Sequence, residues 1–453
     1  MFLVVWQIIF STDYILLPFF ILMWVLIALR FRNKHYKGSV VYRYFMPALV
    51  IRLVGALLSA FMYQYYYGYG DTYFYYFGIN DTFNALFSNP GAAYEIIFKD
   101  FYDWDLSTHS YLTYRGIFTK PKEAMVIKLG AFMSPFGLGT YIGTSFAITF
   151  VSFMGCWGIY RVFYNLYPHL HRTLAFPILF LPSLCFWGTG IMKDSIVLAG
   201  LGLFINGIYY LFISKQKKVL RSVFLILFGT FLMQSIKIYV FASIAPASLL
   251  WIFFMYKNKI RNSILRKVAS PLFFITGAAV GLFALQKLGE SYSQFTLEGF
   301  LEEANKVQWW LKLSTERDGG SGYDLGDIDP SMSGLLRVFP KAVIVTLFRP
   351  FLWETKKLIL LPSVLEAFVT LGFTIYVFFK VGILNIVRIS LSNPVILFCL
   401  TFSIIFAFCV GFTAFNFGAL ARYKIPCLPF YITALIIMLD AKKNQGKTIE
   451  SNA

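Results

Sequence analysis

The chain has 453 residues, of which 58% are hydrophobic and 14% charged, with a mean hydropathy of +0.66 and a net charge of +18. Soluble proteins carry nearer ~25% charged residues, so this composition excludes an ordinary soluble domain and indicates a polytopic membrane protein. The positive charge does not indicate nucleic-acid binding, because Lys and Arg fall in short loops between apolar runs rather than in a basic soluble domain.

Apolar runs long enough to cross the membrane recur along most of the chain. We predict an all-α transmembrane bundle of about 11 spans (range about 10 to 13) in a single integral-membrane domain, residues 1–453. The first run lacks a basic start and a small-residue cleavage site, so it is expected to be a retained helix rather than a signal peptide. Segments 124–134 and 341–352 are expected to be re-entrant or interfacial. The predicted spans are 14–29, 44–63, 139–160, 173–188, 194–213, 222–238, 239–256, 269–286, 357–379, 393–414 and 424–440.

Basic residues are concentrated in every second loop, after the first, fifth, seventh and last predicted spans. The positive-inside rule therefore predicts that these loops and the C-terminus are cytoplasmic and that the N-terminus is outside. Two long loops, 64–138 and 287–356, then face outward and hold almost all the acidic residues. Within the first of them, residues 80–98 have the mixed pattern of helices that lie on a membrane surface.

The stretch YYYGYGDTYFYYF, residues 65–77, places one acid, Asp71, at the outer end of the second span. Gly68 and Gly70 allow the backbone to turn sharply there, and Tyr and Phe rings suit a membrane interface. One interpretation is an aromatic belt, including Tyr73, with Asp71 as the N-cap of the next helix. The alternative is that Asp71 is a functional carboxylate and that nearby tyrosines, Tyr73 among them, stack on sugar rings.

Several cations share the predicted outer face with Asp71 although they run against the positive-inside bias. Fixed cations beside the hydrocarbon suit a phosphate or diphosphate whose lipid tail stays in the membrane, because Arg binds phosphate oxygens in a bidentate way. We expect Asp71, beside such a group, to act as a general base. The candidate phosphate ligands are Lys193, Lys237, Arg349, Arg422 and Lys424, with the acids Asp194 and Glu354 close to them in sequence.

The segment GDTYFYY, followed by LPSLCFWGTGIMKDSIVL at residues 181–198, resembles the GT-C superfamily of integral-membrane glycosyltransferases over roughly residues 40–215. The resemblance implies sugar transfer from a polyprenyl-phosphate donor on the outer face, with the catalytic acid at Asp71. Thr72 follows Asp71 where many members carry a second acid, so metal-binding and two-carboxylate chemistry stay open. The segment NFGALARYKIPCLPF, residues 416–430, is similar to the Arg-containing outer segments of O-antigen-polymerase-like proteins, which join oligosaccharides on polyprenyl diphosphate.

We therefore hypothesise a membrane glycosyltransferase of cell-envelope polysaccharide biosynthesis, with Asp71 as base and the five cations stabilising the leaving phosphate. A polymerase of lipid-linked repeats and a transporter or flippase of lipid-linked glycans are the alternatives. The expected partners are a lipid-linked sugar donor, a glycan, lipid or protein acceptor and membrane lipid, with no nucleic acid. No cofactor is assigned, a divalent cation stays open, and the expected location is a bacterial inner membrane.

Two charged residues inside predicted spans have both structural and functional interpretations. Arg52 either binds substrate or pairs with a neighbouring helix, and Glu366 is either functional or paired with a cation such as Arg52. The run Asp324, Asp327 and Asp329 lacks the spacing of a calcium loop and is interpreted as a solvated loop. The five cysteines lie in apolar segments without metal-ligand spacing and are interpreted as core residues.

Overall fold

The computed structural model describes residues 7–216, 218–257, 309, 313, 321–326, 332–355 and 357–450. Within these residues every regular element is a helix, and the only β contact is an isolated bridge between Gly322 and Asn416. The predicted all-α fold class is therefore confirmed for the part of the chain that the structure describes.

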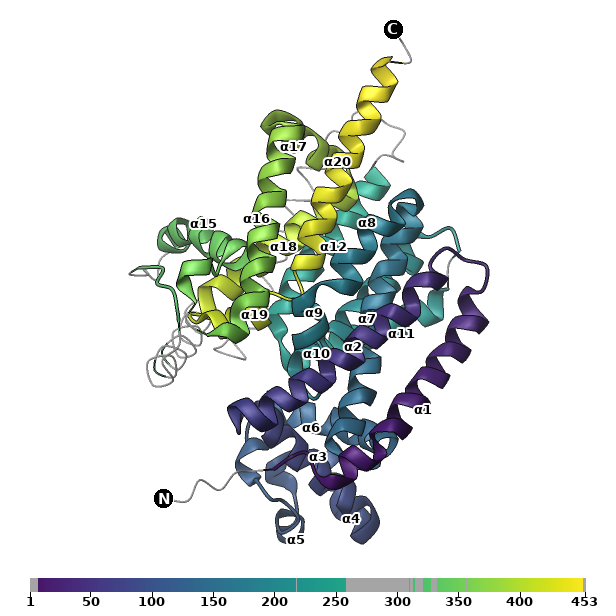
Figure 1. Ribbon diagram of the computed structural model, residues 1–453, viewed down its shortest axis with the longest axis vertical. Helices are drawn as coiled ribbons and strands as arrows, with labels where there is room; N and C mark the ends of the chain where they lie inside the picture. The colour runs from purple at the N-terminus through teal and green to yellow at the C-terminus, as the bar shows by residue number, and fades with distance from the viewer. Residues whose placement is uncertain are drawn as a thin grey trace. The chain divides into compact units, whose positions relative to one another are not determined.

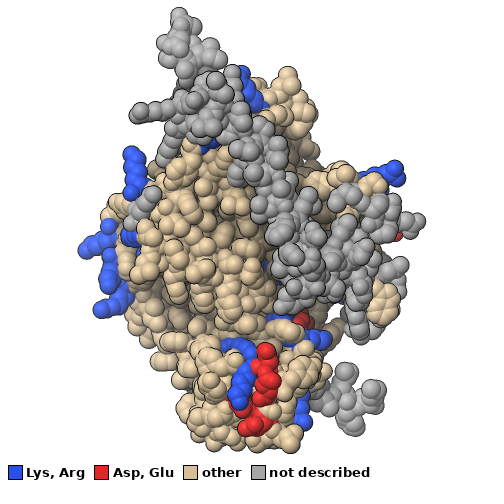
Figure 2. Space-filling model, turned by 180° about the vertical axis from the view of Figure 1, so that it is seen from behind, with Lys and Arg blue, Asp and Glu red and all other residues tan. Residues whose placement is uncertain are grey.

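Eight helices in the described residues are long and apolar enough to cross a membrane. A ninth would be the pair α19 (Phe417–Tyr423) and Leu428–Asn444 of α20 (Leu428–Glu450), which is bent by 62°. Figure 2 shows Lys and Arg gathered in a few places on a face that is otherwise mostly uncharged. The chain is thus an integral membrane protein. The eight are α1 (Ser11–Tyr36), α2 with its π-helical end (Tyr42–Tyr67), α7 (Tyr141–Leu166), α10 with its π-helical end (Lys193–Ile213), α11 (Val219–Ile236), α12 (Ile238–Lys257), Leu358–Val381 containing α16 (Leu361–Val381), and α18 (Pro394–Thr413).

The chain packs as two compact units, Met1–Phe241 and Ala242–Ala453. The predicted span 269–286 lies outside the described residues, as do Asp327 and Asp329, so the total of about 11 spans stays a prediction. The second unit also contains α15 (Met332–Phe348), which overlaps the expected interfacial segment 341–352, and α17 (Ile383–Ser392). The single-domain arrangement of residues 1–453 likewise stays a prediction.

Side-chain contacts define two ends of the first unit. At one end, Arg161 of α7 donates hydrogen bonds to the hydroxyls of Tyr36 at the end of α1 and Tyr210 at the end of α10, both at 3.4 Å. At the other end, the Asp13 carboxylate of α1 accepts from the backbone N–H of Ile142 in the first turn of α7 at 2.7 Å. Helices α1, α7 and α10 therefore run in the same direction (Figure 1).

The end near Tyr36 carries the basic loops, and we call it the basic end; we call the opposite end the loop end. Helix α2 runs antiparallel to α1, because Gln64 near its C-terminus accepts from the backbone N–H groups of Ile8 and Ile9 beside the start of α1, at 2.8 and 3.2 Å. The polar connection 64–138 follows α2 and so begins at the loop end. Opposite ends thus carry the basic loops and the acid-containing loop.

Residues 173–188, predicted as one span, do not form one helix. The segment consists of α8 (His171–Ala175), a π-helical turn (Phe176–Phe180) and α9 (Pro182–Trp187), with an extended residue, Leu181, at the break. Pro177 and Pro182 cannot donate backbone hydrogen bonds, which explains the interruption. The chain still passes between the two ends, because His171 contacts Tyr44 near the start of α2 at 2.7 Å and Lys193 begins α10 at the loop end.

The connection 64–138 is itself mostly helical. Residues 80–98, which were expected to form helices on a membrane surface, form the end of α3 and α4, and these helices pack against each other. Helix α3 contacts both α4 and α6, so the connection folds back on itself rather than extending as a loop. The expected re-entrant or interfacial segment 124–134 lies in α6 except for its last residue, Ser134, which begins the following 3₁₀ turn. The helices are α3 (Asp71–Ser88), α4 (Pro90–Phe98), α5 (Leu106–His109) and α6 (Pro121–Met133), with 3₁₀ turns at Phe101–Asp103, Arg115–Ile117 and Ser134–Gly137.

Candidate functional site

Asp71 is the first residue of α3, at the turn that connects α2 to the loop-end helices. Gly68, with φ of 67°, and Gly70, with φ of 143°, adopt conformations that favour glycine, as the sequence predicted. A Cβ on Gly70 would also lie 2.7 Å from the Tyr63 ring. The N-cap is Gly70 rather than Asp71, so the expected capping role of Asp71 is wrong, and its exposed side chain stands at the helix start.

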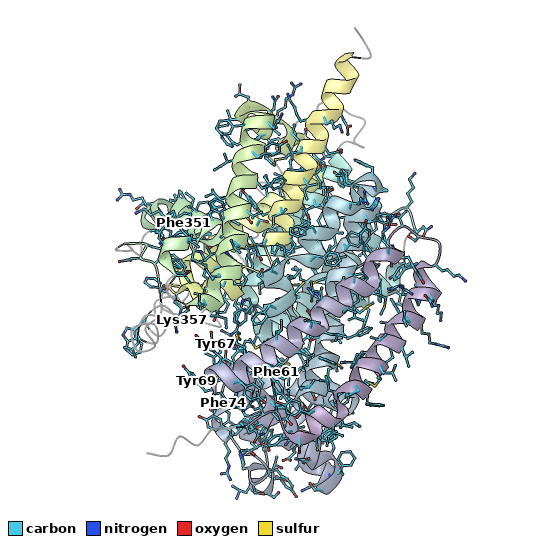
Figure 3. The ribbon with its side chains drawn as sticks, in the orientation of Figure 1. Phe61, Tyr67, Tyr69, Phe74, Phe351 and Lys357 are labelled. Atoms are coloured by element: carbon cyan, nitrogen blue, oxygen red, sulfur yellow. The ribbon has the colours of Figure 1, made fainter. Side chains whose placement is uncertain are left out.

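The Asp71 side chain lines a cavity of about 210 Å³ at the loop end of the first unit. The cavity combines carboxylates, a cation and aromatic rings, and the rings of Phe74 and Tyr114 lie 4.7 Å apart at its wall. Figure 3 shows Phe74 near Tyr67 and Tyr69, from the end of α2 and the turn into α3. The lining residues are Asp71, Phe74 and Tyr75 from α3, Tyr114, Gly116 and Ile117 from the 3₁₀ turn and the residue before it, and Lys120 and Glu123 at the start of α6. We call this cavity the Asp71 pocket.

Glu123 supplies a second carboxylate to the Asp71 pocket. Its Oε1 lies 2.6 Å from Nζ of Lys193, and the two side chains are 25% and 17% exposed. Lys193 is the first residue of α10, so this ion pair fixes the pocket wall to a membrane-spanning helix. Lys193 is thus linked to the Asp71 pocket through Glu123, an acid to which the sequence had assigned no role, and its contact with a phosphate stays a prediction.

Asp81 holds the opposite wall of the pocket in place. Its two carboxylate oxygens accept from the backbone N–H and the hydroxyl of Thr113, at 2.7 and 2.8 Å, and Thr113 precedes the lining residue Tyr114. Burial raises the pKa of Asp81 above its ordinary value, while the Thr113 hydrogen bonds oppose that shift. Asp81, six residues beyond the lining residue Tyr75 on α3, thus holds the segment that carries Tyr114.

Asp194 and Lys237 form a second ion pair immediately behind Lys193. Nζ of Lys237 lies 2.5 Å from Oδ1 of Asp194, and the two side chains are 8% and 0% exposed. This pair joins the C-terminal end of α11 to the first turn of α10. Its burial favours a structural role, so the phosphate contact proposed for Lys237 gains no support from the geometry.

Tyr73 is a packing residue and does not line the Asp71 pocket. It is 2% exposed, and its hydroxyl donates to the backbone carbonyl of Tyr63 at 3.3 Å. Thr72, where many GT-C proteins carry a second acid, is also buried and shares a 2.9 Å hydrogen bond with Tyr141 of α7. The ring-stacking role considered for Tyr73 is therefore wrong, and Tyr75 and Tyr114 are the tyrosines that reach the pocket.

Arg52 is fully buried between α2, α7 and the interrupted segment. Its guanidinium donates to Ser152 Oγ at 3.1 Å, to the Gly188 carbonyl at 3.5 Å and to Cys156 Sγ at 3.0 Å. Ser152 donates to the same Gly188 carbonyl at 2.8 Å. Arg52 therefore pairs with neighbouring backbone and side chains, the structural alternative that the sequence left open.

The remaining candidate cations lie in the second unit. Arg349 forms a two-point ion pair with Glu354, and its guanidinium lies 5.8 and 5.2 Å from the ring centres of Tyr323 and Phe417. Lys424 is fully buried, donates to the Arg349 carbonyl at 3.0 Å and is attracted by the charge of Glu366.

Arg422, in α19, lies with its guanidinium 6.0 Å from the Tyr423 ring. The second unit thus gathers Arg349, Glu354 and Lys424, whereas in the first unit Lys193 pairs with Glu123 at the wall of the Asp71 pocket. The sharing of a single site by all five cations stays a prediction.

Among the residues that the structure describes, no group of three or more His, Cys, Asp or Glu side chains is arranged to hold a metal ion. Comparisons with protein-family models, with characterised proteins and with solved structures found no match to this chain.

Proposed function

We propose that this protein is a membrane glycosyltransferase that moves a sugar from a polyprenyl-(di)phosphate donor to an acceptor at the outer face of the membrane. The observation that carries the proposal is the Asp71 pocket, in which two carboxylates, a cation and aromatic rings meet at the end of the first unit opposite its basic loops. Carboxylates bind sugar hydroxyls as hydrogen-bond acceptors, and aromatic faces suit the apolar faces of sugar rings. The resemblance of residues 40–215 to GT-C enzymes supports the same activity.

Asp71 is the general base in this proposal. Its carboxylate takes the proton of the acceptor hydroxyl as the hydroxyl oxygen bonds to the anomeric carbon of the donor sugar. The bond from that carbon to the phosphate oxygen breaks, and the lipid phosphate leaves with the bonding electrons. Lys120 lines the pocket and Lys193 pairs with its lining residue Glu123, and positive charge lowers the energy of the departing phosphate.

The size of the Asp71 pocket limits what enters it. Its volume of about 210 Å³ is below the range of roughly 300 to 1,000 Å³ that accommodates drug-sized ligands. We therefore assign the pocket to one sugar unit of the acceptor, with the polyprenyl chain remaining in lipid. Arg349, Arg422 and Lys424 of the second unit remain proposed phosphate ligands, as the sequence predicts. The proposed membrane is a bacterial inner membrane, with the N-terminus outside and the C-terminus in the cytoplasm.

A transfer assay with a matched acidic control tests the proposal. The full chain in proteoliposomes is given a polyprenyl-phosphate sugar and a panel of glycan, lipid and protein acceptors, and products are separated by mass. Asp71→Asn is expected to lower the turnover at least about 100-fold, the usual contribution of a general base. Asp103→Asn, in the same connection but outside the pocket, is expected to leave turnover unchanged. Equal turnover by the native chain and Asp71→Asn would remove Asp71 from the base role.

A transporter or flippase of lipid-linked glycans is the second candidate, because the passage from His171 to Trp187 is an interrupted helix, a feature of many transporters. The same proteoliposomes separate the two functions. Movement of a labelled lipid-linked glycan between leaflets without a new glycosidic bond favours the transporter. Product that grows by whole repeat units, rather than by one sugar, favours a polymerase.

A further inference from the structure

A continuous strip of exposed aromatic and aliphatic side chains crosses four elements at the loop end of the first unit. Its six side chains are between 48% and 78% exposed, although each is large and apolar. Soluble surfaces rarely carry contiguous patches of this kind without a binding role. The six residues are Phe87 of α3, Tyr94 and Phe98 of α4, Phe132 of α6, Phe136 of the Ser134–Gly137 turn, and Leu138. We call this set the aromatic strip.

Ring contacts show that the aromatic strip is one surface. Tyr94 and Phe98 stand one turn apart on α4 with ring centres separated by 5.2 Å, and Phe98 lies 6.1 Å from Phe132. Phe136 lies in the 3₁₀ turn that follows α6 directly, four residues after Phe132, and is 55% exposed.

The far end of the strip is connected through Phe83. Its ring lies 5.2 Å from that of Phe87 and packs against Gly139, where an added Cβ would be 2.5 Å away. Gly139 follows Leu138 directly, so Phe87 and Leu138 flank the same contact. The strip therefore runs from α4 across α6 to the residues that precede α7.

Helix α4 is built to lie with this face outward. Ala92, Ala93 and Ile96 are at most 3% exposed and pack inward, whereas Tyr94 and Phe98 point away from the unit. A short helix with one face packed against the protein and an exposed aromatic face is typical of helices that lie in a membrane interface.

The position of the strip identifies what covers it. Leu138 lies three residues before α7 begins at Tyr141, and the Asp13 to Ile142 hydrogen bond places the start of α1 at the same level. Residues Phe10, Tyr14 and Ile15 at that start are 43%, 41% and 75% exposed, as expected for a helix entering lipid. The strip is thus continuous with the lipid-facing surface at the level where two spans enter the bilayer.

We propose that the aromatic strip is a membrane-binding surface that inserts into the headgroup region of the bilayer and lays α4 along it. Tyr and other aromatic rings are favoured at this depth, because one part of the ring is apolar and another part tolerates water. The insertion fixes the height of the loop-end helices above the hydrocarbon. This inference does not depend on the proposed enzymatic activity, because it rests on exposure and on the position of the spans.

Collision accessibility of spin labels tests the proposal. Single variants Phe98→Cys, Tyr94→Cys and Phe136→Cys of the full chain are spin-labelled in vesicles of phosphatidylethanolamine and phosphatidylglycerol. The matched control is Ser107→Cys, an exposed position of α5 in the same connection. The native cysteines are buried except for Cys409, which is partly exposed, so the unmodified chain supplies the background signal.

Labels on the strip are expected to collide more often with oxygen, which concentrates in lipid, than with a water-soluble nickel chelate. The label at Ser107 is expected to show the opposite preference. Greater access of nickel at all three strip positions would show that the strip faces water and would overturn the proposal. Protection from both agents would show a protein contact instead and would also overturn it. Positions on two elements keep the test valid if one variant fails to fold.

Discussion

Two consecutive residues, Lys193 and Asp194, form ion pairs that differ in their depth below the surface. Lys193 pairs with Glu123 at the wall of the Asp71 pocket, where both side chains keep contact with solvent. Asp194 pairs with Lys237 out of reach of solvent. A partly exposed pair contributes little to stability, whereas removing one partner of a buried pair leaves an uncompensated charge.

This difference predicts opposite effects of two Lys-to-Met substitutions. Lys237→Met is expected to destabilise the protein by about 3–5 kcal/mol, because Asp194 then loses its buried ion pair with Lys237. Lys193→Met is expected to cost at most about 1 kcal/mol. Thermal unfolding of the detergent-solubilised chain compares the two variants. Adding Asp194→Leu to Lys237→Met is expected to recover most of the loss, and equal unfolding temperatures for the two single variants would contradict this assignment.

At the residue scale, the sequence predicts the exposed members of the site better than their partners. Asp71 was predicted as a site residue because it follows Gly68 and Gly70 at the end of a span. Both signals come from residues close to Asp71 in the sequence. Glu123 was missed because its role depends on Lys193, 70 residues away, and only its place in the first turn of α6 after Pro121 gave a local signal. Tyr73 was misjudged because sequence order alone does not show which face of α3 packs against α2.

At the element scale, glycines allow the spans of the first unit to pack closely. A Cβ added to Gly202 of α10 would lie 2.1 Å from the backbone carbonyl oxygen of Gly155 in α7. Small residues at such crossings let membrane helices approach each other. A Cβ added to Gly372, in the interior of α16, would have no atom within 4 Å, so Gly372 is the matched control.

Gly202→Ala is therefore expected to destabilise the protein by about 1–3 kcal/mol, since neither backbone can give way without moving a helix. Gly372→Ala is expected to be neutral or to stabilise by up to about 1 kcal/mol through helix propensity. Unfolding temperatures of the two variants in the same detergent provide the comparison. A loss at Gly372 equal to that at Gly202 would show that the close crossing is not the cause.

The connection between α4 and α5 depends on one carboxylate. Glu95 accepts from Nζ of Lys99 at 2.7 Å, from the Asp105 backbone N–H at 2.9 Å and from Thr108 Oγ1 at 2.6 Å. These hydrogen bonds, led by that of Lys99, lower the pKa of Glu95 from its usual 4.5 to about 2. Glu95 therefore stabilises the connection above the unfolded pKa, and this contribution is lost as pH falls through the folded value.

Acidification from pH ~5 to ~2 is expected to open residues 99–108 before the helices around them. Amide hydrogen exchange, corrected for the intrinsic effect of pH, measures this opening. In Glu95→Gln the segment is expected to exchange faster at every pH and to lose its pH dependence in this window. A pH response that persists unchanged in Glu95→Gln would assign the effect to another group.

Hydropathy predicted the location of most spans because the run of apolar residues is itself the physical requirement for crossing a bilayer. It did not predict the break in residues 171–187, because a proline-interrupted segment is as apolar as a continuous helix. Pro177 and Pro182 were the available signal. The interruption is stabilised by Arg52 and Ser152, which both donate to the Gly188 carbonyl from other helices. Such long-range partners are not visible in local sequence.

At the scale of the whole molecule, charge is divided between the two ends of the first unit. The loop between α1 and α2 lies at the basic end, where Arg161 contacts Tyr36, and the connection 64–138 lies at the loop end with the Asp71 pocket. The positive-inside rule assigns the basic end to the cytoplasm. We therefore predict that the pocket faces outward, the side on which the proposed polyprenyl-linked donor would be used.

Matched Ser-to-Cys variants at the two ends test this orientation in intact cells that express the chain. Ser107→Cys, at the loop end, is expected to react with a membrane-impermeant maleimide without lysis. Ser39→Cys, between α1 and α2, is expected to react only after the membrane is opened. The opposite pattern would place the pocket in the cytoplasm and remove the outward donor from the proposal. Equal labelling of both positions before lysis would show that the two ends do not lie on opposite sides of the membrane, and would contradict the parallel spans inferred from Asp13, Ile142 and Arg161.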